Sequence, residues 1–120
     1  MDRCTFVARL CAAINNQDPP SIRVRAVYDD VAIYFKDECE GMVLTDVGDT
    51  SDVQIYPAIA ITVLRAVQDA VAERTTVYWP AGEPTLKYPE AAAVVADGWL
   101  YAWYGDAIRR LLSLEPISLC

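Results

Sequence analysis

The side chains with the clearest capacity for chemistry lie in a short acidic segment near the middle of the chain. Asp46, Asp49 and Asp52, with Thr45 and Thr50, offer the oxygen ligands that calcium and magnesium ions prefer. Their spacing of three residues differs from the alternate acids and distal Glu of an EF-hand loop. Asp and Gly at this density also suit a turn that ends a strand. We expect a turn first, and keep a cation site and carboxylate catalysis as alternatives.

The chain contains no histidine, and this excludes several kinds of active site. Ser-His-Asp and Cys-His arrangements, imidazole metal sites and the most common general base are all ruled out. The segment Gly-Asp-Thr-Ser-Asp lacks the lysine and the glycine spacing of a phosphate-binding loop. We therefore expect a protein that is not an enzyme and needs no cofactor. A small enzyme that depends on a divalent cation is the remaining catalytic alternative.

Acidic residues outnumber basic ones, 17 to 10, which gives a net charge of −7. A chain with this charge is repelled by phosphate backbones and by anionic lipid, so we expect neither nucleic acid nor membrane as a direct partner. Many of the acids gather between residues 29 and 52. They form either a solvated face or a surface for a protein with a basic cleft. The candidate partner-binding acids are Asp29, Asp30, Asp37, Glu38 and Glu40.

The cysteines and the N-terminal residues indicate a cytoplasmic protein. The four cysteines, Cys4, Cys11, Cys39 and Cys120, show no Cys-x-x-Cys spacing of zinc or redox sites. We expect them to be buried small apolar residues in a reducing compartment, with Cys120 open to adventitious disulfides. The first residues lack the pattern of a signal peptide, and no apolar run reaches the ~18 residues of a membrane-spanning helix.

The length of 120 residues and the apolar content of 54% predict one globular domain over residues 1–120. Helical spacing of apolar residues predicts a first helix over 2–17, which ends before Pro19 and Pro20. Two alternating runs, 22–26 and 31–35, predict an antiparallel hairpin around a short acidic turn. A third strand is predicted over 42–47 and a short fourth strand over 52–56.

The second half of the chain predicts more helix. A helix is expected over 57–74 with Pro57 at its first position, followed by a short strand at 75–79. The segment 89–114 is expected to be a long helix, with its glycines as kinks. Its first half is apolar on all sides, so it either fills the core or meets another chain. The residues favoured for partner binding there are Trp99, Trp103 and Tyr104, in a possible homodimer through residues 94–114.

These elements predict an α+β fold: a helix, a three- to four-stranded antiparallel meander, a helix, a short strand and a long C-terminal helix packed on one sheet face. The stretch from Ile33-Tyr34 to Leu44-Thr45-Asp46, Gly48 and Thr50 resembles the family called domain of unknown function 1828, found in bacteria and phages. The resemblance implies the same element order over most of residues 1–114, and it implies no catalytic residues. The family's occurrence in phages implies a role in conflict with a host or in its regulation.

Three functions follow as hypotheses. The first is a non-enzymatic, acidic protein-binding module of phage or mobile-element type. It would occlude the basic cleft of a host defence complex by mimicking DNA, as anti-CRISPR and anti-restriction proteins do. The second is a structural phage or complex subunit that self-assembles through Trp99, Leu100, Trp103 and Tyr104. The third is a small enzyme that uses Asp46 and Asp49 with a divalent ion.

Overall fold

The computed structural model describes residues 2–45, 52–75, 79–80, 89–106, 108 and 110–119, without the side chains of 52–54. Within these residues the order helix, strand, strand, strand occurs twice, and a short seventh strand follows. The elements are α1 (Arg3–Asn16), β1 (Ile22–Val27), β2 (Asp30–Phe35), β3 (Glu38–Val43), α2 (Asp52–Thr75), β4 (Ala91–Ala96), β5 (Trp99–Gly105), β6 (Arg110–Ser113) and β7 (Ile117–Ser118). The sequence itself shows no repeat that corresponds to this order.

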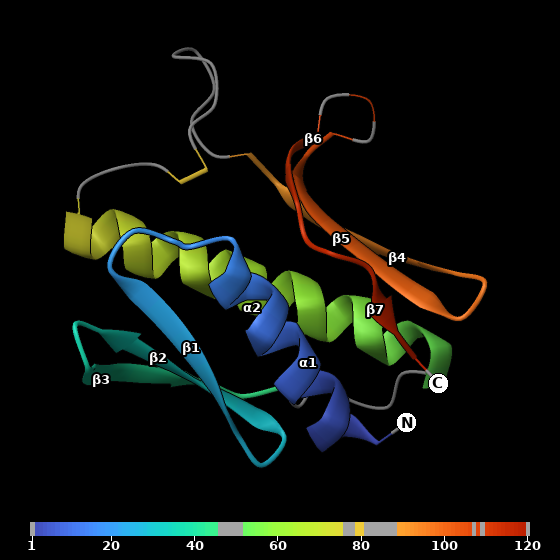
Figure 1. Ribbon diagram of the computed structural model, residues 1–120, viewed down its shortest axis with the longest axis horizontal. Coiled ribbons are helices and arrows are strands. Elements are labelled where there is room, and N and C mark those ends of the chain that lie inside the picture. Colours follow the sequence, from blue (N-terminus) through green and yellow to red (C-terminus); the bar gives the residue numbers. More distant parts are fainter. Residues whose placement is uncertain are drawn as a thin grey trace.

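The strands form two separate antiparallel sheets with the helices between them (Figure 1). The first sheet has the order β1-β2-β3. The second sheet has the order β4-β5-β6, and β7 pairs with the other end of β5. The helix α1 packs on β1 and β2 and touches β7, while α2 packs on strands of both sheets. One continuous cluster of buried apolar residues joins both helices and both sheets.

The helix α1 is fixed at both ends by polar side chains. At its start the Asp2 carboxylate accepts the Thr5 N–H at 2.7 Å, which satisfies one of the free donors of the first turn. Near its end the Asn15 amide both donates to the Val24 carbonyl and accepts the Val24 N–H, each at 2.9 Å. A side-chain amide thus takes the place of a neighbouring strand along the outer edge of β1 and anchors the helix to the first sheet.

The helix α2 is the central element of the core. Among its described side chains, six are fully buried: Ile59, Ala60, Val63, Leu64, Val67 and Val71. The stretch Ile55–Thr75 is long and apolar enough to cross a membrane by length and composition, with a mean hydropathy of 1.3. Here strands of both sheets supply the apolar surroundings of this stretch, and Phe6 of α1 packs on Tyr56 near its start, with ring centres 4.7 Å apart. Its exposed residues, including Arg65 and Asp69, form a polar stripe.

Two of the hairpins turn through pairs of residues with positive φ. The turn between β4 and β5 has Asp97 at 52° and Gly98 at 79°, and the turn between β2 and β3 has Lys36 at 48° and Asp37 at 70°. Paired positive φ values are the mark of the type I′ turn, which matches the twist of the flanking strands. Asp-Gly is among the residue pairs that favour it most strongly.

The structure confirms the α+β class, the first helix and the antiparallel hairpin, and corrects three predicted elements. The long C-terminal helix over 89–114 is wrong, because this segment forms the strands β4, β5 and β6. The predicted fourth strand over 52–56 is the first part of α2, so Pro57 lies inside that helix. The third strand begins at Glu38, four residues before the predicted start at Met42. The predicted strand 75–79 falls mostly outside the described residues.

The amide of Asn15 provides a test of how α1 is held. We expect Asn15→Ala to lower the free energy of unfolding by about 1–3 kcal/mol, because both backbone groups of Val24 lose their partner in a part-buried position. Urea denaturation measures this change. The control is Asn16→Ala, which truncates an exposed amide in the same turn. Equal stabilities of the two variants would contradict the anchoring role.

Candidate protein-binding surface

The largest group of exposed apolar side chains in the described residues lies on the outer face of the second sheet. Successive residues of β5 point to opposite faces, so Trp99, Tyr101 and Trp103 point outward. The pairing of β5 places Val94 opposite Tyr101 on the same face. We call this surface the aromatic face. Its members are Ala92, Val94, Ala96, Trp99, Tyr101, Trp103 and Leu111, with Pro116 beside them.

Several of these side chains are far more exposed than core residues of their type. Val94 is 44% exposed, Trp99 43% and Leu111 40%. Nearby, Ile108 between β5 and β6 is 94% exposed. Single exposed apolar residues are common on proteins, but a contiguous apolar patch on one sheet face marks an interaction surface. The aromatic face is therefore the candidate site.

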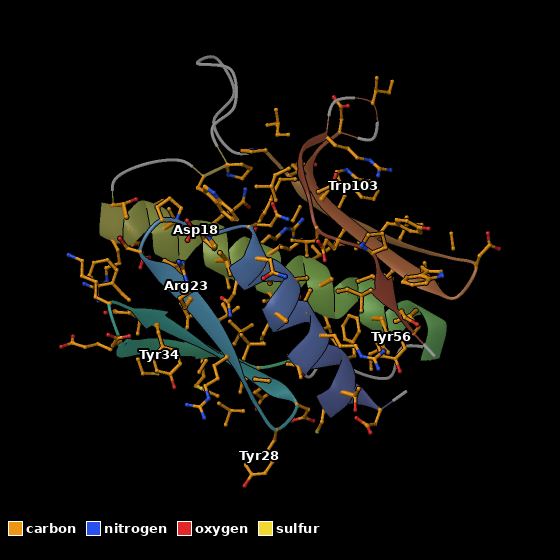
Figure 2. All side chains as sticks on the ribbon, in the orientation of Figure 1. Asp18, Arg23, Tyr28, Tyr34, Tyr56 and Trp103 are labelled. Atoms are coloured by element: carbon orange, nitrogen blue, oxygen red, sulfur yellow. The ribbon has the colours of Figure 1, made fainter. Side chains whose placement is uncertain are left out.

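The aromatic face also carries charged groups that could orient a partner. The Arg110 guanidinium lies 4.1 Å from the centre of the Trp103 ring, and Trp103 is 7% exposed beneath its neighbours. Such stacking stabilises by about 0.5–2 kcal/mol. In the part of the chain that the structure describes, the buried Trp103 indole N–H has no acceptor. Figure 2 shows Trp103 on the second sheet, away from the helices.

The opposite end of the aromatic face is hollowed. A shallow hollow of about 410 Å³ is lined by Trp99, Tyr101, Glu115 and Pro116. A second hollow, of about 420 Å³, continues past Trp99 to α1, where Arg9 and Asn16 line it. Trp99 thus stands between two depressions, and a partner's side chain could contact its ring from either side.

The three aromatic residues predicted for partner binding are divided between the surface and the core. Trp99 is exposed and Trp103 is covered, while Tyr104 points inward and is fully buried. The Tyr104 hydroxyl donates to the Leu64 carbonyl at 2.7 Å, and its ring meets Trp79 edge-on at 5.2 Å. Burial raises the pKa of Tyr104 well above its usual value. Tyr104 therefore holds β5 against α2 and offers nothing to a partner.

The five predicted acidic residues do not form one cluster. Asp29 and Asp30 lie at one end of β2, and Asp37 and Glu38 lie at the other. At about 3.4 Å per residue, the six-residue strand separates these ends by about 17 Å. Figure 2 shows Tyr28, which precedes Asp29, pointing away from the body of the molecule.

Three of these acids also have partners within the chain. Asp29 lies 4.0 Å from the Arg3 guanidinium, and an Asp30 carboxylate oxygen accepts the Thr45 N–H at 3.1 Å. Glu40 forms an ion pair with Arg74 at the end of α2. These contacts give the residues structural roles, and the arginines beside Asp29 and Glu40 offset part of the negative charge of the first sheet. Asp37 and Glu38 are left at the exposed β2–β3 turn.

The segment that could bind a cation lies largely outside the described residues. Asp46 and Asp49 belong to the part that is not described, and the side chain of Asp52 at the start of α2 is not described either. Thr45 is fully buried, and its hydroxyl donates to the Asp29 carbonyl. Among the described residues no group of three or more Cys, Asp or Glu side chains could hold a metal ion.

The cysteines differ in exposure, which corrects the expectation that they are all buried. Cys11 is buried in α1, whereas Cys4 and Cys39 are exposed, and all three are free thiols. Burial raises the pKa of Cys11 from 9.0 to about 12. Cys120 lies outside the described residues.

The comparisons with known proteins add no relative to these observations. No protein-family model, curated protein or solved structure matches the chain significantly. The resemblance to domain of unknown function 1828 accordingly stays a prediction, and so do the functions it implies.

The exposure of the thiols can be tested by alkylation. In a Cys120→Ser background at pH 8, we expect iodoacetamide to modify Cys4 and Cys39 and to leave Cys11 unmodified, because the reactive thiolate of Cys11 is scarce and covered. Mass spectrometry of tryptic peptides identifies the modified sites. In urea all three thiols should react, and modification of Cys11 in the folded protein at the same rate would contradict its burial.

The raised pKa values of Cys11 and Tyr104 predict a loss of stability in alkali. Both groups bind their protons more tightly in the folded than in the unfolded protein. Their contribution to the free energy of unfolding is therefore complete below about pH 9 and is lost as the pH rises through 9 to 12. We expect the free energy of unfolding to fall over this window in urea titrations. Cys11→Ala should show a shallower fall than wild type, while Cys39→Ala, at an exposed thiol, should follow the wild type.

Proposed function

We propose that this protein is a non-enzymatic assembly subunit that forms a homodimer through the aromatic face. The observation that carries the proposal is that exposed apolar side chains gather on this face, with Arg110 and Glu115 at its two ends, in a chain of net charge −7. Trp, Tyr and Arg, the residues that dominate binding energy at protein interfaces, all occur on it. A polar or acidic surface would be the simpler solution for a sheet face that only meets water.

The charges of the face favour a second copy as the occupant. Arg110 lies beside Trp103 at one end, and Glu115 lies beside Trp99 at the other. In a two-fold symmetric contact the same patch meets itself, so Arg110 of each copy would face Glu115 of the other. The two ion pairs would form at the rim of an apolar contact and fix its orientation. A sheet-on-sheet contact of this kind resembles a domain core divided between two chains.

The repulsion between two acidic chains also supports this surface over others. Two copies at −7 repel each other wherever their acids approach. The exposed acids Asp37 and Glu38 lie on the first sheet, across the helices from the aromatic face. Contact through the second sheet therefore keeps those acids apart. The occlusion of a basic host cleft remains a prediction, with less support because its five acids are separated.

The mass of the protein in solution tests the proposal. We expect analytical ultracentrifugation under reducing conditions to show about twice the 13.3 kDa of one chain at high concentration, with dissociation on dilution. Trp99→Ser should weaken the dimer by at least about tenfold, because it removes the most exposed aromatic ring of the face. The control is Tyr28→Asn at the β1–β2 turn, a residue that is 86% exposed and distant from the face.

A charge exchange identifies the orientation of the two copies. Arg110→Glu and Glu115→Arg should each weaken the dimer, and the double variant should recover it, because the reversed pairs attract again. Circular dichroism confirms that each variant is folded. A monomer at every concentration would contradict the homodimer, and a dimer that withstands Trp99→Ser and both charge reversals would place the interface elsewhere.

A further inference from the structure

The strand β4 has a free edge that the aromatic face does not include. Among the strands that the structure describes, β4 pairs with β5 alone. The Glu90 carbonyl accepts the Gly105 N–H at 2.9 Å, and Ala102 directs its carbonyl away from β4, to Leu114. In an antiparallel pair, residues alternate between those whose N–H and C=O groups bond to the partner strand and those whose groups point away from it. The backbone groups of Ala92, Val94 and Ala96 therefore bond to β5. Those of Ala91, Ala93 and Val95 point away from β5, toward the free edge. Within the described residues no hydrogen bond reaches these outward groups.

The edges of the first sheet are protected in ways that β4 is not. Asn15 occupies the backbone groups of Val24 on β1. On the other edge, β3 carries Glu38 and Glu40, and its pairing with β2 is interrupted by a register shift. Charges and irregular pairing are the usual devices that prevent an added strand. β4 has the sequence Ala-Ala-Ala-Val-Val-Ala and pairs regularly with β5, so it has neither device.

A hollow beside the start of β4 could receive a side chain of an added strand. Its volume is about 220 Å³. Its lining includes Arg65 and Asp69 of α2, and Glu90, the residue directly before β4. The buried Gln68 side chain donates to the Pro89 carbonyl at 2.7 Å, which fixes the entry of the chain into β4 against α2. The edge and the hollow thus lie side by side where the second sheet meets α2.

The charges around β4 indicate what kind of strand it accepts. Glu90 precedes the strand and Asp97 follows it, and among the described residues Asp69 and Glu90 line the hollow together with Arg65. A second copy is disfavoured here, because antiparallel pairing of two β4 strands brings Glu90 of one copy near Asp97 of the other. Lysine or arginine at both ends of an added strand would instead meet carboxylates.

We propose that β4 binds an extended segment of a partner protein by strand addition, and that this segment has a small apolar centre flanked by Lys or Arg. Main-chain hydrogen bonds to Ala91, Ala93 and Val95 would supply the affinity, and the flanking acids would supply the selectivity. The added segment would pair beside β4, in the plane of the second sheet. A second copy on the aromatic face would instead pack on the flat side of that sheet. The proposal therefore does not rest on the homodimer, and both contacts can form together.

Two synthetic peptides test the proposal on the full chain. One has the sequence Lys-Lys-Ala-Val-Thr-Val-Ala-Lys-Lys and the other carries Glu in place of each Lys. We expect the basic peptide to shift the amide resonances of Ala91, Ala93 and Val95 in 15N NMR titrations and the acidic peptide to leave them unchanged. If the basic peptide leaves these amides unchanged, or if the acidic peptide shifts them equally, the proposal is wrong.

Two sets of variants distinguish the contribution of main-chain hydrogen bonds to peptide binding from the contribution of the flanking carboxylates. Ala93→Pro removes an outward N–H but no hydrogen bond to β5, and we expect about tenfold weaker binding of the basic peptide. Ala93→Ser, of similar size and with the N–H retained, is its control. Glu90→Gln with Asp97→Asn should weaken binding in low salt only, and Asn preserves the positive φ of the turn.

These variants keep the proposal testable whatever their stability. If Ala93→Pro fails to fold, the Glu90→Gln, Asp97→Asn variant decides alone, because both changes are at exposed side chains. Unchanged affinity in either folded variant would overturn the proposal. Concentration-dependent shifts of the Ala91, Ala93 and Val95 amides that persist without peptide in the Trp99→Ser variant would overturn it too, because they would show that a second copy occupies the edge and not the aromatic face.

Discussion

The structure depends on the burial of α2 on two sides. Its apolar residues, among them Ile59, Val63 and Val67, lie between two sheets whose described strands do not pair with each other. The Tyr104 hydroxyl ties β5 to the Leu64 carbonyl, and Arg74 at the helix end pairs with Glu40 of the first sheet. Each sheet thus covers one side of α2 and leaves its own outer face free, and those outer faces differ in character.

Because the outer faces of the two sheets differ, the surfaces suited to binding a partner lie on the second sheet. The first sheet presents Arg23, Arg25 and Tyr34 outward and has protected edges. The second sheet presents Val94, Trp99 and Leu111, and its β4 edge is open among the described residues. Apolar contact through a face and hydrogen bonding through an edge use different groups of the same three strands. The second sheet could therefore serve two partners without any change in the fold.

The sequence predicted the first half of the fold well, because there the period of the apolar residues is unambiguous. In α1 it follows the helix, and in β1 and β2 apolar and polar residues alternate. The second half failed because Trp99 and Trp103 are four residues apart, a spacing that puts them on one face of either a helix or a strand. The alanines of β4 favour a helix, so propensity gave the wrong answer as well.

One local signal would have corrected the prediction and revealed most of the candidate site. Asp97-Gly98 is a typical hairpin turn, and a hairpin there places Trp99, Tyr101 and Trp103 outward by alternation. The sequence could not show that Arg110 covers Trp103 or that Glu115 lines the hollow, because these contacts depend on how β6 and the segment after it return to β5. The separation of the acids likewise follows only from the strand register.

The exposed position of β3 has a consequence for how the native protein opens. Five of its six residues are exposed, Gly41 supplies no side chain, and a register shift interrupts its pairing with β2. Little apolar area is lost when this strand detaches, so its local unfolding requires much less free energy than global unfolding. The rim of the first sheet is therefore where solvent exchange and proteolytic cleavage would begin, and the backbone groups of β2 that pair with β3 would be exposed in the same opening.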